Sequence, residues 1–239
     1  MQNSVEFRVW GRYALFTDPL TKIGGEKYSY QIPTYEALKG ILSSVYWKPT
    51  IVWMIDKLRV MKRIKTQTRS AKPIKYYSDS NDLSIYTYLA DVEYQVQAHF
   101  EWNLNREDLV IDRNENKHYF VAKRMIERGG RRDIFLGTRE CQGYVEDCRF
   151  NEGIGEYDDY GELSFGLMFH GFDYPDEGAK DKFYARFWRP KMIDGVIEFV
   201  RPDDRSLLQK FVRPMKANPP NTIGLQEEGL LEGFQEGSV

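Results

Sequence analysis

The sequence predicts an α+β fold, because alternating strand patterns and two amphipathic helices follow one another along the first part of the chain. Their order is β-α-β-β-α-β, which is the ferredoxin-like arrangement. Short strands and turns then fill the chain between Glu140 and about Val200. We therefore expect a ferredoxin-like N-terminal domain over residues 1–139, a smaller β-rich C-terminal domain over 140–213 and an acidic, disordered tail over 214–239.

The first three elements are a strand, a helix and a second strand. Apolar and polar residues alternate over 5–9, as in a half-buried strand. Thr34 is the expected N-cap of a helix whose apolar residues recur at helical spacing. Pro49 ends this helix, because the residue before a proline resists the helical conformation. The apolar run 51–55 predicts the second strand.

The other three elements complete the pattern. Apolar residues alternate with mostly polar ones over 86–102, which predicts a long strand or a hairpin with a solvated His99 on its polar face. A second helix is expected from about Lys117 to Arg128, ended by two glycines at 129–130. Residues 133–137 then form a short strand that completes the order. His170, at the end of a later apolar strand, is expected to be structural.

The composition is that of a globular protein, with 41% hydrophobic and 15% aromatic residues. No apolar stretch approaches the roughly 20 residues of a membrane span, and the first residues lack the pattern of a signal peptide. We expect a cytoplasmic protein with no membrane partner. Cys141 and Cys148 are the only cysteines, and with three histidines they do not make a zinc pattern, so neither a metal nor a cofactor is expected.

The net charge of -2 conceals an uneven distribution of charge along the chain. Eight basic residues and no acidic one lie between Lys57 and Lys75, and a second basic cluster follows in the region of the second helix. Segregated charge of this kind is compatible with nucleic-acid binding, although a charge run can also be only a solvated face. The candidate nucleic-acid contacts are Lys57, Arg59, Lys62, Arg63, Lys65, Arg69, Arg124, Arg128, Arg131 and Arg132.

Lys117 and His118 are adjacent at the expected start of the second helix. Side chains at successive helical positions lie roughly 100° apart, and the backbone N–H groups of a helix start attract anions. The pair therefore suits proton transfer beside a bound phosphate. The alternative is an ordinary solvated helix start.

Tyr46 is expected in the last turn of the first helix, on the border between the apolar stripe and a polar face. A border position leaves its hydroxyl free to face a cleft, whereas simple packing of the ring is the alternative.

Histidine, lysine and tyrosine together supply what RNA cleavage without a metal requires. A 2′-hydroxyl must lose a proton, the phosphorane must be stabilised and the leaving 5′-oxygen must gain a proton. Histidine titrates nearest neutrality, lysine stabilises negative charge and a tyrosine hydroxyl orients or relays a proton. The chain offers no carboxylate cluster that suggests a two-metal nuclease, and no phosphate-binding loop or dinucleotide fingerprint.

Four segments carry a family resemblance: WGRYALFTDP at 10–19, PTYEALKGIL at 33–42, VYWKP at 45–49 and FLGTREC at 135–141. As a set they resemble the type I-C (Dvulg subtype) CRISPR-associated proteins of Cas family five, in the RAMP superfamily, over about residues 5 to 202. The resemblance implies a ferredoxin-like domain followed by a β-rich part. The tail lies outside it.

The resemblance also implies an activity and a site. Type I-C members of the family cut precursor CRISPR RNA at the base of the repeat hairpin, leave a 2′,3′-cyclic phosphate and stay with the other subunits of the interference complex. The family's catalytic tyrosine, lysine and histidine fall on Tyr46, Lys117 and His118.

Two other functions remain open from the sequence. One is a non-catalytic subunit that holds the 5′ end of the guide RNA in a larger assembly. The other is a metal-dependent nuclease acting on DNA. The sequence does not determine which catalytic residue is the base and which is the acid.

Overall fold

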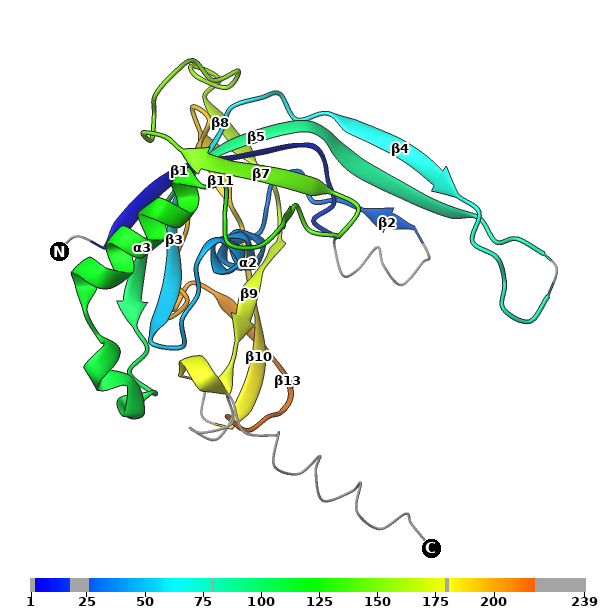
Figure 1. The fold of residues 1–239 in the computed structure, drawn as a ribbon. Coiled ribbons are helices and arrows are strands. Elements are labelled where there is room, and N and C mark those ends of the chain that lie inside the picture. Colours follow the sequence, from blue (N-terminus) through cyan, green and yellow to red (C-terminus); the bar gives the residue numbers. More distant parts are fainter. Residues whose placement is uncertain (1–2, 18–25, 79, 179–180, 218–239) are drawn as a thin grey trace, which may run out of the picture.

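The computed structural model describes residues 3–17, 26–78, 80–178 and 181–217, and it confirms the α+β class (Figure 1). In this described part of the chain, the α-helices α2 (Tyr35–Val45) and α3 (Glu115–Glu127) accompany two sheets of mostly antiparallel strands. Most of the tail that was expected to be disordered, residues 218–239, lies outside the described residues. In the part of the chain that the structure describes, none of the helices has the length and apolar content of a membrane span.

The larger sheet has ten strands. Eight of them form a continuous series, in the order β6 (Ile134–Phe135), β7 (Gln142–Asp147), β1 (Ser4–Ala14), β5 (Ser84–Trp102), β3 (Ile51–Val60), β12 (Val196–Glu198), β11 (Lys191–Ile193) and β8 (Glu162–Ser164). The other two, β2 (Lys27–Tyr28) and β4 (Thr66–Ala71), both pair with the first half of β5. The smaller sheet has the order β13 (Leu208–Pro214), β10 (Lys182–Trp188) and β9 (Met168–Asp173).

The centre of the large sheet has the ferredoxin-like order β7-β1-β5-β3, with every neighbouring pair antiparallel. The strand that completes it is β7, so the prediction that residues 133–137 do so is wrong. Only Ile134 and Phe135 are extended there, and they pair with β7 at the sheet edge. The chain then turns at Gly137, where φ is +94°, and returns beside β1.

The sheet continues past residue 139, the boundary that we expect between the two domains. Strands β7, β8, β11 and β12 all follow this position in the chain and join the same sheet as β1, β3 and β5. Only β9, β10 and β13 form a sheet of their own. The division at 139 therefore stays a prediction.

Both helices begin at the expected kind of cap. Helix α2 (Tyr35–Val45) starts after Thr34, whose hydroxyl accepts a hydrogen bond from the Ala37 backbone N–H. Helix α3 (Glu115–Glu127) starts slightly earlier than predicted, because the Asn114 side chain accepts from the Lys117 N–H. Gly129 follows α3 with φ of +79°, which confirms the glycine stop.

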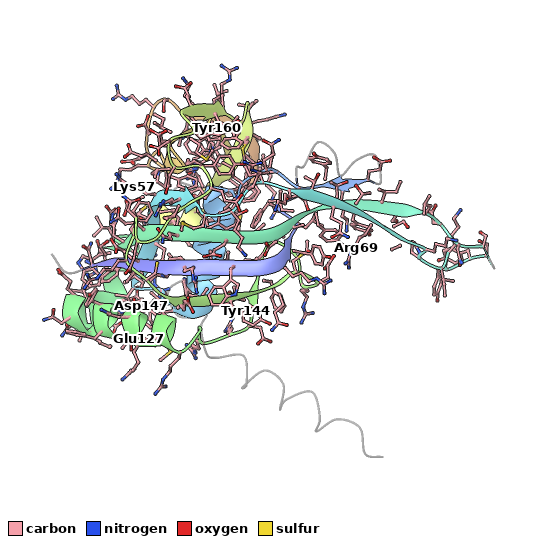
Figure 2. All side chains as sticks on the ribbon, turned by 90° about the horizontal axis from the view of Figure 1, so that it is seen from above. Lys57, Arg69, Glu127, Tyr144, Asp147 and Tyr160 are labelled. Carbon is pink, nitrogen blue, oxygen red and sulfur yellow. The ribbon has the colours of Figure 1, made fainter. Side chains whose placement is uncertain are left out.

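The first half of β5 extends beyond the body of the protein as an arm (Figure 1). Strand β4 pairs with it antiparallel, from Thr66 opposite Leu89 to Ala71 opposite Ser84, and β2 lies along its other edge. Figure 2 shows the molecule from above, with Arg69 on the arm and Tyr144 on β7. The basic run 57–75 is therefore divided between β3 in the body and β4 in the arm.

Replacing Gly137 by alanine is expected to destabilise the fold by more than about 2 kcal/mol, as overpacking together with a strained backbone does. A Cβ at this position would collide with the backbone carbonyl of Leu15, and φ is positive. The measurement is urea unfolding. Gly161→Ala is the matched control, because φ there is +83° but no atom lies within 4 Å of the added Cβ. Equal losses in the two variants would contradict the predicted collision.

Candidate active site

Tyr46 lies one residue beyond α2 and not in its last turn. Its backbone is extended, with φ of -154° and ψ of 125°, although its N–H still donates to the Leu42 carbonyl at 2.8 Å. Its own carbonyl accepts from the Trp53 indole N–H at 2.8 Å. These two bonds fix the backbone, and the ring is 4% exposed. The side chain is therefore buried against the sheet and does not face an open cleft.

His118 lies in the first turn of α3, where its ring is 0% exposed. Its Nδ1 lies 2.8 Å from the Tyr46 hydroxyl, and its Nε2 lies 2.8 Å from the backbone carbonyl of Asp112. A carbonyl can only accept, so Nε2 carries the hydrogen. In the neutral ring Nδ1 then accepts the proton that the Tyr46 hydroxyl donates. The structure thus joins two residues that lie 72 positions apart in the sequence.

Asp112 connects the rest of the cluster. It is the last residue of the 3-10 helix η1 (Glu107–Asp112), and its carboxylate accepts from the Thr50 hydroxyl at 2.6 Å and pairs with the Lys117 ammonium. The Lys117 hydrogen bond, with a further contribution from Thr50, holds the pKa of Asp112 below its usual value. Lys117 itself is half exposed, at 50% of its side chain. Lys117 and His118 therefore point in different directions, as their roughly 100° separation on the helix requires.

No pattern in the sequence pointed to Asp112 or Thr50 as members of the site. Asp112 lies only six residues before His118, but in a turn where an acidic residue is common, and Thr50 follows a proline in a connection. The two residues meet only because the chain just before β3 packs against η1, which is a tertiary contact.

Tyr46 keeps its proton over the physiological pH range. Burial raises its pKa to about 12, and Asp112 adds to the rise while Arg131 opposes it. Because this pKa is raised, its contribution to stability is complete below the ordinary tyrosine value of about 10 and is lost as pH rises from there through the folded value. At neutral pH the group is a hydroxyl that donates to His118.

A cleft of about 220 Å³ lies beside the end of α2, lined by Ser43, Ser44, Trp47, Arg131 and Arg132. The backbone N–H groups of the two arginines donate to the carbonyls of Val45 and Ser44, at 3.3 and 3.1 Å. These bonds hold the turn after α3 against the end of α2. Both arginines are exposed, so the cleft offers two cations, and Arg131 is close enough to Tyr46 to oppose the rise in its pKa.

The predicted contacts of the second basic cluster are exposed, as binding to an RNA backbone requires. Arg124 and Arg128, at the end of α3, are exposed like Arg131 and Arg132 in the turn that follows. All four predicted contacts of this cluster thus lie on one stretch of chain that leads to the cleft.

The first basic run is less uniform, and Arg59 requires a correction. Its side chain is 5% exposed, and it donates to both carboxylate oxygens of Asp158, at 2.8 and 2.7 Å. It also donates to the carbonyls of Glu152 and Gly153. A guanidinium that is buried and bonded in this way is not free for a phosphate, so we remove Arg59 from the candidate contacts. It holds the 152–158 loop on the sheet.

Other members of the first run are exposed to different degrees. Lys57 pairs with Glu198 at 2.7 Å, Lys62 with Asp91 at 2.8 Å, and Arg63 lies 3.7 Å from Glu156. Lys65 and Arg69 are exposed at the base and on the strand of the arm.

Residues 4–200 match the sequence model of a family of CRISPR-associated proteins, Cas_Cas5. This match covers most of the chain. The chain belongs to the CRISPR-associated Cas5 family.

Similarity to individual proteins extends over most of the chain. The chain is 28% identical to a CRISPR pre-crRNA endoribonuclease Cas5d of Mannheimia succiniciproducens, over 83% of this chain and 95% of the relative. It is 27% identical to a Cas5d of the same description from Thermus thermophilus, over 78% and 80%. A crystal structure of a CRISPR-associated protein, 34% identical, superposes with a TM-score of 0.70 over 86% of this chain and 96% of the other. A functionally uncharacterized protein from Streptococcus mutans, 39% identical, gives 0.68 over 82% and 92%.

The other two histidines of this Cas5 family member lie outside the cluster. His99 is not simply solvated as expected, because its Nδ1 lies 2.8 Å from Asp56, and this hydrogen bond raises its pKa. His170 is buried, and its Nε2 donates to the Val200 carbonyl at 3.0 Å. Burial lowers its pKa to about 3, in keeping with a structural residue. Within the described residues no group of three or more His, Cys, Asp or Glu is placed to hold a metal ion.

Proposed function

We propose that this chain is an endoribonuclease that cleaves precursor CRISPR RNA at the base of the repeat stem-loop and then remains in the type I-C interference complex. The observation that carries the proposal is the 2.8 Å hydrogen bond between the Tyr46 hydroxyl and His118 Nδ1, made between the ends of two helices. Family membership supports it, because two relatives bear the name pre-crRNA endoribonuclease. A cytoplasmic location follows from such a substrate and is tested by cell fractionation.

The proposed reaction uses the RNA's own 2′-hydroxyl as the nucleophile. A bond forms between the 2′-oxygen and phosphorus while the bond from phosphorus to the 5′-oxygen breaks. The 2′-hydroxyl loses a proton and the 5′-oxygen gains one, which leaves a 2′,3′-cyclic phosphate and a 5′-hydroxyl. Tyr46 and His118 move the proton, and Lys117 stabilises the charge that develops on the phosphorane.

Burial assigns different positions to the three groups. Lys117 is half exposed and is the member of the set that faces solvent. His118 has both ring nitrogens occupied and acts through Tyr46, whose hydroxyl it holds and polarises. Because the Tyr46 ring is buried, the side chains that cover it must move before its hydroxyl can contact an RNA that enters beside Arg131.

The test of the function is cleavage of the repeat RNA in excess EDTA. We expect cleavage to persist and the upstream product to end in a 2′,3′-cyclic phosphate, because the proposed groups transfer protons and bind phosphate without a metal. A matched substrate with a single 2′-deoxy nucleotide at the cut site is expected to remain intact. Cleavage of the deoxy substrate at the same bond would refute the internal nucleophile.

A non-catalytic RNA-binding subunit is the second candidate, and one observation favours it. His118 is fully buried with both nitrogens bonded, as in a histidine that only supports the fold. In that case the wild-type protein would bind the repeat RNA and leave it uncut under all conditions.

The arginines of the cleft are expected to dominate the salt dependence of RNA binding. Replacing Arg131 and Arg132 by glutamine is expected to lower the slope of log affinity against log salt by about two units, because each phosphate contact releases a counterion. Lys191→Gln is the control, since Lys191 is paired with Glu162 at 2.8 Å, is not among the predicted RNA contacts and lies outside the cleft. Filter binding between about 50 and 200 mM salt measures both. An unchanged slope for the double variant would place the RNA backbone elsewhere.

A further inference from the structure

Trp47 is a large aromatic residue that the fold leaves uncovered beside the candidate site. It is 46% exposed, whereas the preceding Tyr46 is 4% exposed. The backbone of Tyr46 is extended, so successive side chains point to opposite sides of the chain. Tyr46 turns inward to His118, and Trp47 turns outward. Packing of the core therefore does not account for the indole ring.

A single aromatic residue on a surface is ordinary, but Trp47 lines a cleft of about 220 Å³ together with two cations. The other lining residues are Ser43, Ser44, Arg131 and Arg132, and none of these described residues is acidic. A larger cavity of about 440 Å³ differs, because four carboxylates oppose its three cations: Glu101, Asp173, Glu177 and Asp203. An anion with an aromatic part therefore suits the smaller cleft.

The polar groups of the cleft differ between its two walls. The Ser43 and Ser44 hydroxyls donate to the carbonyls of Lys39 and Gly40 within α2, at 2.8 and 3.1 Å. Each hydroxyl oxygen can then only accept from a ligand, whereas guanidinium groups can only donate. Acceptors on α2 and donors on the turn after α3 complement the N–H groups of a nucleobase and the oxygens of a phosphate.

We propose that Trp47 stacks on one unpaired base of the RNA next to the scissile bond, while Arg131 and Arg132 bind the phosphates that flank this nucleotide. Sites for drug-sized ligands measure roughly 300–1,000 Å³, so the smaller cleft holds one nucleotide at most. A base must leave its helical stack to lie on an aromatic ring. The Cα atoms of Trp47 and Tyr46 are about 3.8 Å apart, which places this base beside the reacting group. The inference rests on the proposed function and adds a subsite to it.

The experiment is a double-mutant cycle between Trp47 and the RNA bases, measured by filter binding. The repeat RNA carries a 2′-deoxy nucleotide at the cut site and one abasic nucleotide, which is moved in turn through the unpaired segment at the foot of the hairpin. With the wild-type protein, we expect one abasic position next to the cut site to lower affinity about tenfold, the scale for loss of a stacked base. With Trp47→Leu, the RNA that retains all its bases should bind about tenfold more weakly, and the abasic nucleotide at that position should have no further effect.

Two further variants are the controls. Trp47→Tyr keeps an aromatic ring, so we expect it to retain the abasic effect and to bind within about threefold of wild type. Phe211→Leu is the matched control, because Phe211 on β13 is exposed to a similar degree, 49%, and lies outside the cleft. It is expected to bind like wild type. Thermal unfolding of each variant checks the fold.

Cleavage kinetics separate this role from that of Tyr46. Trp47→Leu is expected to raise the half-saturating protein concentration about tenfold and to leave the single-turnover rate at saturation within about threefold, as loss of a binding contact does. Tyr46→Phe is expected to do the reverse. A lower rate at saturation in Trp47→Leu with unchanged half-saturation would make Trp47 only a support for Tyr46 and contradict the proposal.

A second measurement does not depend on the leucine variant. A stacked base quenches indole emission, so the RNA is expected to quench the wild-type protein more than Trp47→Tyr, which keeps the other four of the five tryptophans. Equal quenching of these two proteins would overturn the proposal, as would abasic effects that are equal in wild type and folded Trp47→Leu at every position. Failure of the proposed function would be different: the wild-type protein would leave all-ribose repeat RNA uncut, whatever the result of the cycle.

Discussion

Replacing Tyr46 by phenylalanine is expected to lower the single-turnover rate of repeat RNA cleavage by about 100-fold or more, the scale for losing a positioned proton-transfer group. This corresponds to about 2.7 kcal/mol of activation free energy. The substitution removes only the hydroxyl that donates to His118 Nδ1, and it leaves the buried ring in place. Affinity for the RNA is expected to remain close to that of wild type, because phosphate contacts come from exposed cations.

Tyr35→Phe is the matched control for this prediction. Tyr35 begins helix α2, which ends just before Tyr46. It is also buried, and its hydroxyl donates to the Met54 sulfur at 3.3 Å and not to His118. We expect this variant to cleave at the wild-type rate. Normal cleavage by Tyr46→Phe, or an equal loss in both variants, would remove Tyr46 from the chemistry.

Replacing His118 by alanine is expected to produce a loss of rate of similar size, about 100-fold or more. It is also expected to destabilise the protein by about 2–4 kcal/mol, because it creates a cavity and leaves the buried Tyr46 hydroxyl and Asp112 carbonyl without their partner. Single-turnover cleavage and filter binding are therefore compared at a temperature where circular dichroism shows the variant to be folded.

His99→Ala provides the control for loss of a histidine. His99 is partly buried and paired with Asp56, but it lies outside the Tyr46 cluster. A variant of His118 that loses affinity as much as rate would support the binding-subunit function. Rate loss in His118→Ala with unchanged affinity, and a normal rate in His99→Ala, is the result expected of a processing enzyme.

Local patterns were sufficient for most elements of the ferredoxin-like core. Helix α2 follows from its apolar spacing and Thr34 cap, and β5 from its long alternation. The closing strand was missed because the chain turns at Gly137 and only the next strand, β7, pairs with β1. Residues 142–147 do alternate in burial, as a strand with one buried face does. The short apolar run before the turn resembled a strand and forms only two extended residues.

The candidate site depended more on contacts that are distant in sequence. The order of elements suggested that the ends of the two helices could meet, and Tyr46 and His118 do. Nothing local indicated that the Asp112 carbonyl occupies His118 Nε2, or that the ring is fully buried. Arg59 is similar, because its partner Asp158 is 99 residues away and a run of charges does not show which member turns inward.

The most direct test of the account is a double-mutant cycle on the single-turnover cleavage rate, with Tyr46→Phe, His118→Ala and the two combined. If the two residues act through their shared hydrogen bond, their effects are not additive. We expect the double variant to be no slower than the slower single variant, within about threefold. Rate losses that multiply, so that the double variant is about 10,000-fold slower than wild type, would show two independent contributions and contradict a unit formed by Tyr46 and His118.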